Sequence, residues 1–160
     1  MSETHSASPM TFLCDQNLGR LARWLRMMGF DARYMRVWDE DTIRDAIEEG
    51  RIFLTRKRSL AFRQGVLVME SDHLDDQIAH LGMVLGLGDK IEPFSRCSIC
   101  NLPLKCVKRV DVEKQVPEYV YATHDEFARC PGCSRIYWRG TQPARSLERI
   151  RSLMHKDKRG

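Results

Sequence analysis

Residues 11–31 read TFLCDQNLGRLARWLRMMGFD, and this stretch decides the fold. Its first four residues form a short apolar run that ends at Asp15, which predicts a first strand. Asn17 can cap the helix that follows, because its side chain accepts hydrogen bonds from free amides. Five apolar residues then recur every three or four positions and predict one buried helix face: Leu18, Leu21, Ala22, Leu25 and Met28. Gly29 is typical of the end of such a helix.

The alternation of strand and helix continues to about residue 90. Further strands are expected at 31–35, 52–55 and 66–69, and further helices at 39–49 and 74–85. This spacing predicts βαβ units and a parallel sheet, so the predicted fold class is α/β. Parallel sheets place functional residues just beyond the carboxyl ends of their strands.

Four carboxylates follow the predicted strands and are the candidate catalytic residues: Asp15, Asp39, Asp41 and Asp72. Clustered carboxylates repel one another, and a bound Mg²⁺ or Mn²⁺ would relieve that repulsion. Such an ion could activate a water molecule and stabilise the charge of a phosphodiester transition state. The alternative is that these residues cap helices or occupy first turns, where carboxylates suit the positive end of the helix dipole.

Two CxxC pairs, Cys97/Cys100 and Cys130/Cys133, lie in the second half of the chain with 29 residues between them. Each pair places two thiolates on one tight turn, and two turns supply the four ligands of a tetrahedral zinc site. Because a full thiolate shell leaves no open position, the predicted Zn²⁺ is structural. The rival interpretation is a redox motif, but such a motif usually occurs singly at a strand–helix turn.

The chain is expected to divide into a disordered tail, a first domain and a second module. The tail is residues 1–10, which lack the basic start and apolar core of a secretory signal. Residues 11–90 form the α/β domain, and residues 91–160 form a β-rich zinc ribbon with a C-terminal helix. Within the ribbon, β structure is expected at 107–112 and 119–121. No apolar run approaches the roughly 20 residues of a membrane span, so a cytoplasmic protein without a membrane partner is expected, with its oligomeric state open.

Charge differs between the two halves of the chain. Residues 1–96 carry 13 Lys and Arg against 15 Asp and Glu, whereas residues 97–160 carry 13 against 7. The basic half favours an anionic partner such as RNA, although a small zinc module can also simply expose its cations. The candidate RNA-binding residues are Arg20, Arg23, Arg26, Arg56 and Lys57. Trp24, Tyr137 and Trp138 could stack on unpaired bases.

The sequence closely resembles the Mut7-C family in three places. These are residues 12–31, the run Leu54-Thr55-Arg56, and the two Cys pairs together with residues 136–140. The likeness extends from about residue 11 to about residue 150. It implies a PIN-like, three-layer α/β domain followed by a zinc ribbon, and a metal-dependent endoribonuclease activity. It also implies that Asp15 is the first acid of the PIN-like site and that the second lies within Asp39–Asp41. RNA is the implied partner, alone or within a ribonucleoprotein.

The chain departs from the family pattern in two places. Lys57 stands where the family usually has Asp, which changes the local charge by two units, and Thr141-Gln142-Pro143 replaces an expected Ser-His. A lysine within about 4 Å of Asp15 could neutralise that carboxylate in place of a metal. Two functions are therefore open: a metal-dependent ribonuclease, which the family pattern favours, and an RNA- or ribonucleoprotein-binding module that has lost cleavage. A protein-interaction adaptor is a third.

Overall fold

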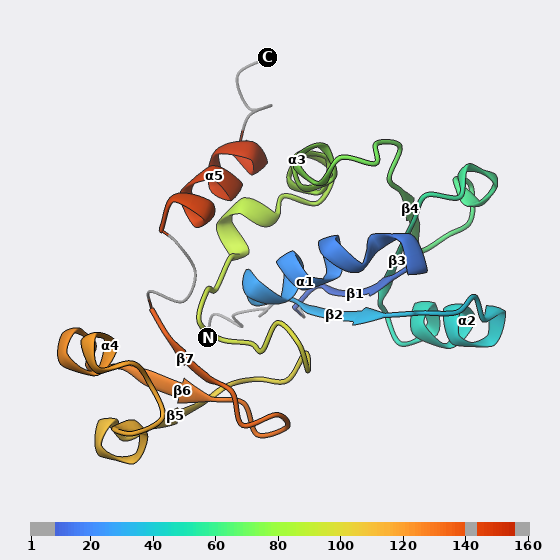
Figure 1. Cartoon of the computed structure of the whole chain (residues 1–160). Coiled ribbons are helices and arrows are strands. Elements are labelled where there is room, and N and C mark those ends of the chain that lie inside the picture. Colours follow the sequence, from blue (N-terminus) through green and yellow to red (C-terminus); the bar gives the residue numbers. More distant parts are fainter. Residues whose placement is uncertain (1–8, 140–143, 156–160) are drawn as a thin grey trace, which may run out of the picture.

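The computed structural model describes residues 9–139 and 144–155, and its first domain is built on a parallel sheet of four strands (Figure 1). The strands lie in the order β2-β1-β3-β4. Their bounds are β1 Thr11–Cys14, β2 Asp31–Tyr34, β3 Ile52–Thr55 and β4 Val66–Val68. In the register, Phe12 of β1 lies opposite Ala32 on one side and Ile52 on the other. All four carboxyl ends therefore reach the same edge of the sheet, as the βαβ pattern predicts.

Helices cover both faces of this sheet, which gives the expected three layers. The helices are α1 Gly19–Met27, α2 Glu40–Glu48, α3 Leu74–Leu85 and α5 Ala144–His155. Neighbouring residues of a strand point to opposite faces, so Phe12 joins a core with α1, α3 and α5, while Leu13 joins a core with Ile43 of α2. Short 3-10 segments complete the domain: η1 Gln16–Leu18, η2 Arg58–Leu60 and η3 Leu87–Lys90.

The start of the first helix differs from the prediction at Asn17. The cap is Asp15, whose side chain accepts a hydrogen bond from the N–H of Gln16, and the 3-10 turn η1 precedes α1. The prediction for the end of the helix is confirmed, because Gly29 has a φ of 98°. A Cβ at Gly29 would also lie 2.4 Å from the carbonyl oxygen of Glu92, so glycine is required for this approach of the interdomain segment.

The C-terminal helix α5 returns to the first domain and packs on α3, as Figure 1 shows. Gly82 of α3 lies at the contact, where a Cβ would approach the Cα of Met154 to 2.5 Å. Ile150 and Met154 are buried in the same core as α1 and α3. Although α5 follows the ribbon in sequence, it therefore belongs to the core of the α/β domain. No helix in the described ranges is long and apolar enough to cross a membrane.

The second module has a small antiparallel sheet in the order β5-β6-β7. Its strands are β5 Lys105–Val107, β6 Phe127–Arg129 and β7 Ile136–Trp138. Of the β structure expected at 107–112 and 119–121, only Val107 lies in a strand; the rest of the prediction is wrong, because η4 Arg109–Val112 and α4 Glu118–Thr123 are helical. Val112, Val116 and Val120 pack as one cluster with Phe127, so these two helical turns, not a strand, cover the small sheet.

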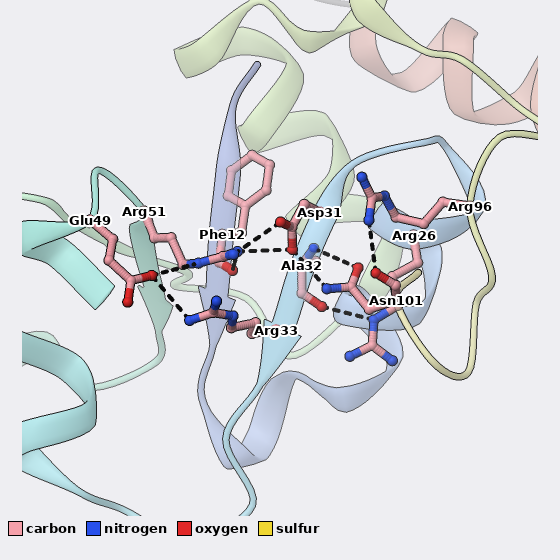
Figure 2. Close-up of polar contacts among 9 residues, drawn as sticks. All are labelled: Phe12, Arg26, Asp31, Ala32, Arg33, Glu49, Arg51, Arg96 and Asn101. Atoms are coloured by element: carbon pink, nitrogen blue, oxygen red, sulfur yellow. Dashed lines mark hydrogen bonds and ion pairs between the residues drawn. The ribbon is translucent and has the colours of Figure 1, made fainter. Parts of the chain in front are cut away.

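Asn101, just after the first cysteine pair, joins the ribbon to the edge strand β2 (Figure 2). Its side-chain oxygen accepts a hydrogen bond from the N–H of Ala32 at 3.0 Å, and its side-chain nitrogen donates to Asp31 at 2.7 Å. Asp31 accepts two further hydrogen bonds of 2.9 Å from Arg51. The ribbon thus satisfies a backbone group on an edge strand that would otherwise lack a partner in the sheet.

Arg26 makes a second link between α1 and the first cysteine turn. Its guanidinium donates to the carbonyl oxygens of Ala32 at 2.8 Å, Ser98 at 3.2 Å and Ile99 at 3.1 Å. Two of these carbonyls belong to the CxxC turn itself. The orientation of the ribbon on the α/β domain therefore depends on the shape of the turn that carries the cysteines.

Candidate functional site

Four sulfur atoms, from Cys97, Cys100, Cys130 and Cys133, lie within 4.8 Å of one another. Tetrahedral zinc with Zn–S bonds of about 2.3 Å has sulfur–sulfur edges of about 3.8 Å. The sulfurs of Cys97 and Cys133 are 3.8 Å apart. The cluster therefore fits the zinc ribbon expected from the sequence, and its four cysteines could bind a metal such as zinc.

The two cysteine turns share the same backbone geometry. In each, the residue after the second cysteine has a positive φ, 61° at Asn101 and 62° at Ser134. The N–H of that residue donates to the carbonyl of the first cysteine, Cys97 or Cys130, at 3.0 Å in both turns. Because both turns fold in the same way, each presents its two thiols on one side, which is the arrangement that a four-sulfur site needs.

The thiol of Cys97 lies among hydrogen-bond donors that favour its ionised form. The hydroxyl oxygen of Tyr137 lies 3.1 Å from its sulfur, and the N–H of Cys100 donates to the sulfur at 3.4 Å. Burial acts to raise the pKa of the Cys97 thiol, but these hydrogen bonds outweigh it and lower the pKa to about 7. Thiolates are the form that binds metal, so this thiol is suited to bind at neutral pH.

Asp15 stands at the carboxyl end of β1, an interior strand, and only 5 % of its surface is exposed. One carboxylate oxygen accepts the N–H of Gln16 at 2.6 Å, and the other accepts the hydroxyl of Thr55 at 2.7 Å. The N–H of Lys57 donates in turn to the Thr55 hydroxyl at 3.1 Å. Asp15 is therefore fixed by the ends of two adjacent strands.

The other three candidate acids are exposed and are engaged elsewhere. Asp39 is the N-cap of α2, and the hydrogen bond that it accepts from the Thr42 hydroxyl lowers the pKa of its carboxyl. Asp41 forms an ion pair of 3.0 Å with an arginine of its own helix. Asp72 follows the far edge strand β4 and lines a hollow between α1, α3 and α5. In the part of the chain that the structure describes, the cysteine cluster is the only group of three or more metal-binding side chains.

The ammonium of Lys57 turns towards Trp38, not towards Asp15. It lies 4.6 Å from the centre of the Trp38 ring, in a cation–π contact. Within the described ranges, no ion pair joins it to Asp15, so Lys57 does not neutralise that carboxylate by direct contact. Lys57 is exposed, together with its neighbours Arg56 and Arg58.

The predicted RNA-binding residues fall into two groups. Arg20, Arg23, Arg56 and Lys57 are exposed. Arg26 is half-buried, and its guanidinium is bound to three carbonyl oxygens between the domains, so the RNA surface proposed below does not include it. Of the aromatic candidates, Trp24 packs against the core and Tyr137 is buried beside Cys97.

Sequence reasoning missed the polar residues that hold the two modules together. Asp31 was predicted only as the first residue of a strand, and Arg51 and Asn101 were not singled out. Arg51, directly before the apolar strand 52–55, was the available signal, because a buried charge needs a partner. The partners of Asp31, which are Arg51 and Asn101, lie 20 and 70 residues away along the chain, and no local sequence pattern indicates contacts over such separations.

Comparison with known families gives one result that covers most of the chain. Residues 10–150 match the family model described as the Mut7-C RNAse domain. The curated proteins and the solved structures gave no match. The second departure from the family pattern, Thr141-Gln142-Pro143, lies outside the described residues. The match spans both the parallel sheet and the cysteine cluster, and this chain therefore belongs to the Mut7-C RNase domain family.

Proposed function

We propose that the chain binds RNA and that the carboxyl edge of its sheet contacts RNA phosphates instead of holding a catalytic divalent ion. The observation that carries the proposal is the run of exposed cations after β3, namely Arg56, Lys57 and Arg58. Phe62, on the same connection, is fully exposed and offers a face on which a base can stack. Cations supply sequence-independent affinity for phosphates, and an exposed aromatic ring adds contact with unpaired bases.

Several contacts support the loss of metal binding at this edge. Mg²⁺ binds through oxygen ligands at about 2.0–2.1 Å and prefers carboxylates. Asp15 is buried and hydrogen-bonded, while Asp39 caps a helix. Lys57 brings a positive charge to the position where the family pattern has a carboxylate. A divalent cation would meet several cations there, and the carboxylates of Asp15 and Asp39 already accept hydrogen bonds, which weakens its binding.

We also propose that the four cysteines hold one Zn²⁺ with a structural role. The four-sulfur shell leaves no open position for a substrate. Binding energy at such a site contributes to folding energy, because the unfolded chain has no preformed site. The metal would therefore fix the first cysteine turn and, through Asn101 and Arg26, the position of the ribbon.

The second candidate function is a metal-dependent endoribonuclease that uses Asp15, Asp39, Asp41 and Asp72 with Mg²⁺ or Mn²⁺. The family match favours it, since the family model describes an RNase domain. The position of Asp15 at the end of an interior parallel strand also suits a catalytic acid. A cytoplasmic location and a ribonucleoprotein partner remain predictions from the sequence.

A cleavage assay separates the two functions. Zinc-loaded wild type, Asp15→Asn and Lys57→Asp are incubated with end-labelled single-stranded RNA and Mn²⁺, and binding is measured in parallel by fluorescence anisotropy. We expect wild type to bind RNA and leave it intact, and Lys57→Asp to gain Mn²⁺-dependent cleavage. Cleavage by wild type that disappears in Asp15→Asn would reject the proposal and establish the endoribonuclease.

A further inference from the structure

A hollow of about 540 Å³ lies between α1 and the ribbon. Its lining comes from α1, from both cysteine turns, from the segment before α4, and from β7. None of its lining residues belongs to the loops that follow the strands of the parallel sheet, so it is separate from the RNA contact proposed above. The hollow exists only while the ribbon is held against α1.

The lining combines an apolar floor with two cations. Met27, Pro117, Ile136 and Trp138 supply apolar surface. Arg23 and Arg135 also line the hollow, and both residues are exposed. The polar part of the lining further includes Ser98, Gln115 and Ser134. Ligand sites of about 300–1,000 Å³ with a mostly apolar lining and a few polar groups are typical of small-molecule recognition. The volume falls within that range, and the lining mixes apolar with polar and charged residues.

We propose that this hollow holds one unpaired nucleotide of an RNA strand. The base packs against Trp138 and the apolar floor, and the flanking phosphates contact Arg23 and Arg135. An acidic peptide would satisfy the two guanidiniums but need not offer a planar ring that packs on the indole. The proposal rests on RNA as the partner of this chain, and it adds a second contact on the opposite module.

Two structural features suit the hollow to this role. Trp138 is half-buried, because one side of it packs on the cluster of Val112, Val120 and Phe127, so its ring is held in place. Arg26 ties α1 to the first cysteine turn and therefore fixes the distance between Arg23 and the ribbon. A site that is already formed loses less free energy on binding than one that must be ordered.

Trp138 can report on its own site. The chain has three tryptophans, so a Trp24→Phe/Trp38→Phe variant leaves Trp138 as the only indole fluorophore. The full-length, zinc-loaded variant is titrated with a single-stranded RNA octamer while Trp138 fluorescence and the anisotropy of the labelled RNA are recorded. We expect saturable quenching of Trp138. Arg23→Gln and Arg135→Gln should each weaken binding and reduce the slope of log K against log salt by about 0.7, the value for one phosphate on a single strand.

Lys108→Gln is the matched control, because it removes one exposed charge from the ribbon outside the hollow. It should leave the quenching of Trp138 unchanged. If RNA binds by anisotropy but Trp138 is not quenched and both arginine variants bind like wild type, the hollow is not a nucleotide site and RNA binding itself stands. If polyglutamate quenches Trp138 as well as RNA does, recognition of a base is refuted. If anisotropy detects no RNA binding at all, the proposed function fails, and this site fails with it.

Discussion

Replacing Asp31 by Asn tests whether the polar network beneath the ribbon stabilises the fold. The side chain of Arg51 is 8 % exposed and that of Asp31 is 27 % exposed, and two hydrogen bonds of 2.9 Å join them. Removing one partner of a buried pair costs about 3–5 kcal/mol, because it leaves the other charge unpaired. Arg51 would keep the carbonyl of Phe12 at 3.2 Å and the carboxylate of Glu49 at 3.5 Å. We therefore expect Asp31→Asn to lower the free energy of unfolding by about 2–3 kcal/mol, which is at or below the lower end of that range.

Urea unfolding and thermal melting of the zinc-loaded protein measure this loss. For a chain of this size, about 2–3 kcal/mol corresponds to a fall in Tm of about 5–10 °C. Glu49→Gln is the matched control, since it removes the same charge from a side chain that is 51 % exposed. An exposed pair contributes at most about 1 kcal/mol. If Asp31→Asn is no less stable than Glu49→Gln, the reasoning about this network is wrong.

Three further predictions concern the thiols, the acidic edge and the pH dependence of stability. In the zinc-loaded protein we expect maleimide to label one thiol, that of the exposed Cys106, and chelation to raise the number to five, as counted by mass spectrometry. Cys14 should stay unlabelled, because burial raises the pKa of its thiol to about 12; labelling of three or more thiols before chelation would contradict a four-cysteine zinc site. In electron paramagnetic resonance titrations, wild type should leave the free Mn²⁺ signal unchanged and Lys57→Asp should reduce it, whereas a reduction by wild type that Asp15→Asn removes would show a working metal site. Burial acts to raise the pKa of Asp31, but hydrogen bonds from Arg51 and Asn101 outweigh it and leave the pKa below its usual value. As the pH falls, Asp31 is therefore protonated in the unfolded chain before it is protonated in the folded protein, so the stability that it contributes at neutral pH is lost below about pH 4. Urea unfolding should show a smaller acid-induced loss of stability for Asp31→Asn than for wild type. Equal losses would refute the assignment.

The sequence predicted the elements whose signals are local. The run from Thr11 to Gly29 contains an apolar strand, a helix with one apolar face and a glycine at its end, and each appears in the structure. The cysteine cluster was equally predictable from the sequence, because two CxxC turns form a four-sulfur site as soon as they come together. Between the pairs the prediction failed: valines have a high β propensity, but Pro117 stands at the start of α4, where a helix tolerates proline.

The geometry of the acidic edge depended on contacts that a sequence pattern does not contain. The carboxyl ends of the strands do share one edge, as predicted, but a side chain there also has local partners. Asp39 caps the helix that it precedes, and Asp41 pairs within that helix. The sequence left open whether Lys57 reaches Asp15, and its ammonium lies over Trp38, which follows a different strand. In each case the position of the side chain follows from a contact that the folded chain supplies. The residue type at a strand end does not reveal that contact.

The most direct test of the account is the affinity of the zinc-loaded protein for single-stranded RNA, measured by anisotropy at two or more salt concentrations without divalent metal. Wild type should bind, its affinity should fall steeply with salt, and Lys57→Gln should weaken binding and reduce the salt slope by about 0.7. Lys90→Gln is the control, because Lys90 is exposed and lines a hollow with Thr11, at the opposite, amino end of β1. This variant should bind like wild type. Binding that is absent, that ignores salt, or that is equal in wild type and Lys57→Gln would contradict the claim that this edge contacts RNA phosphates.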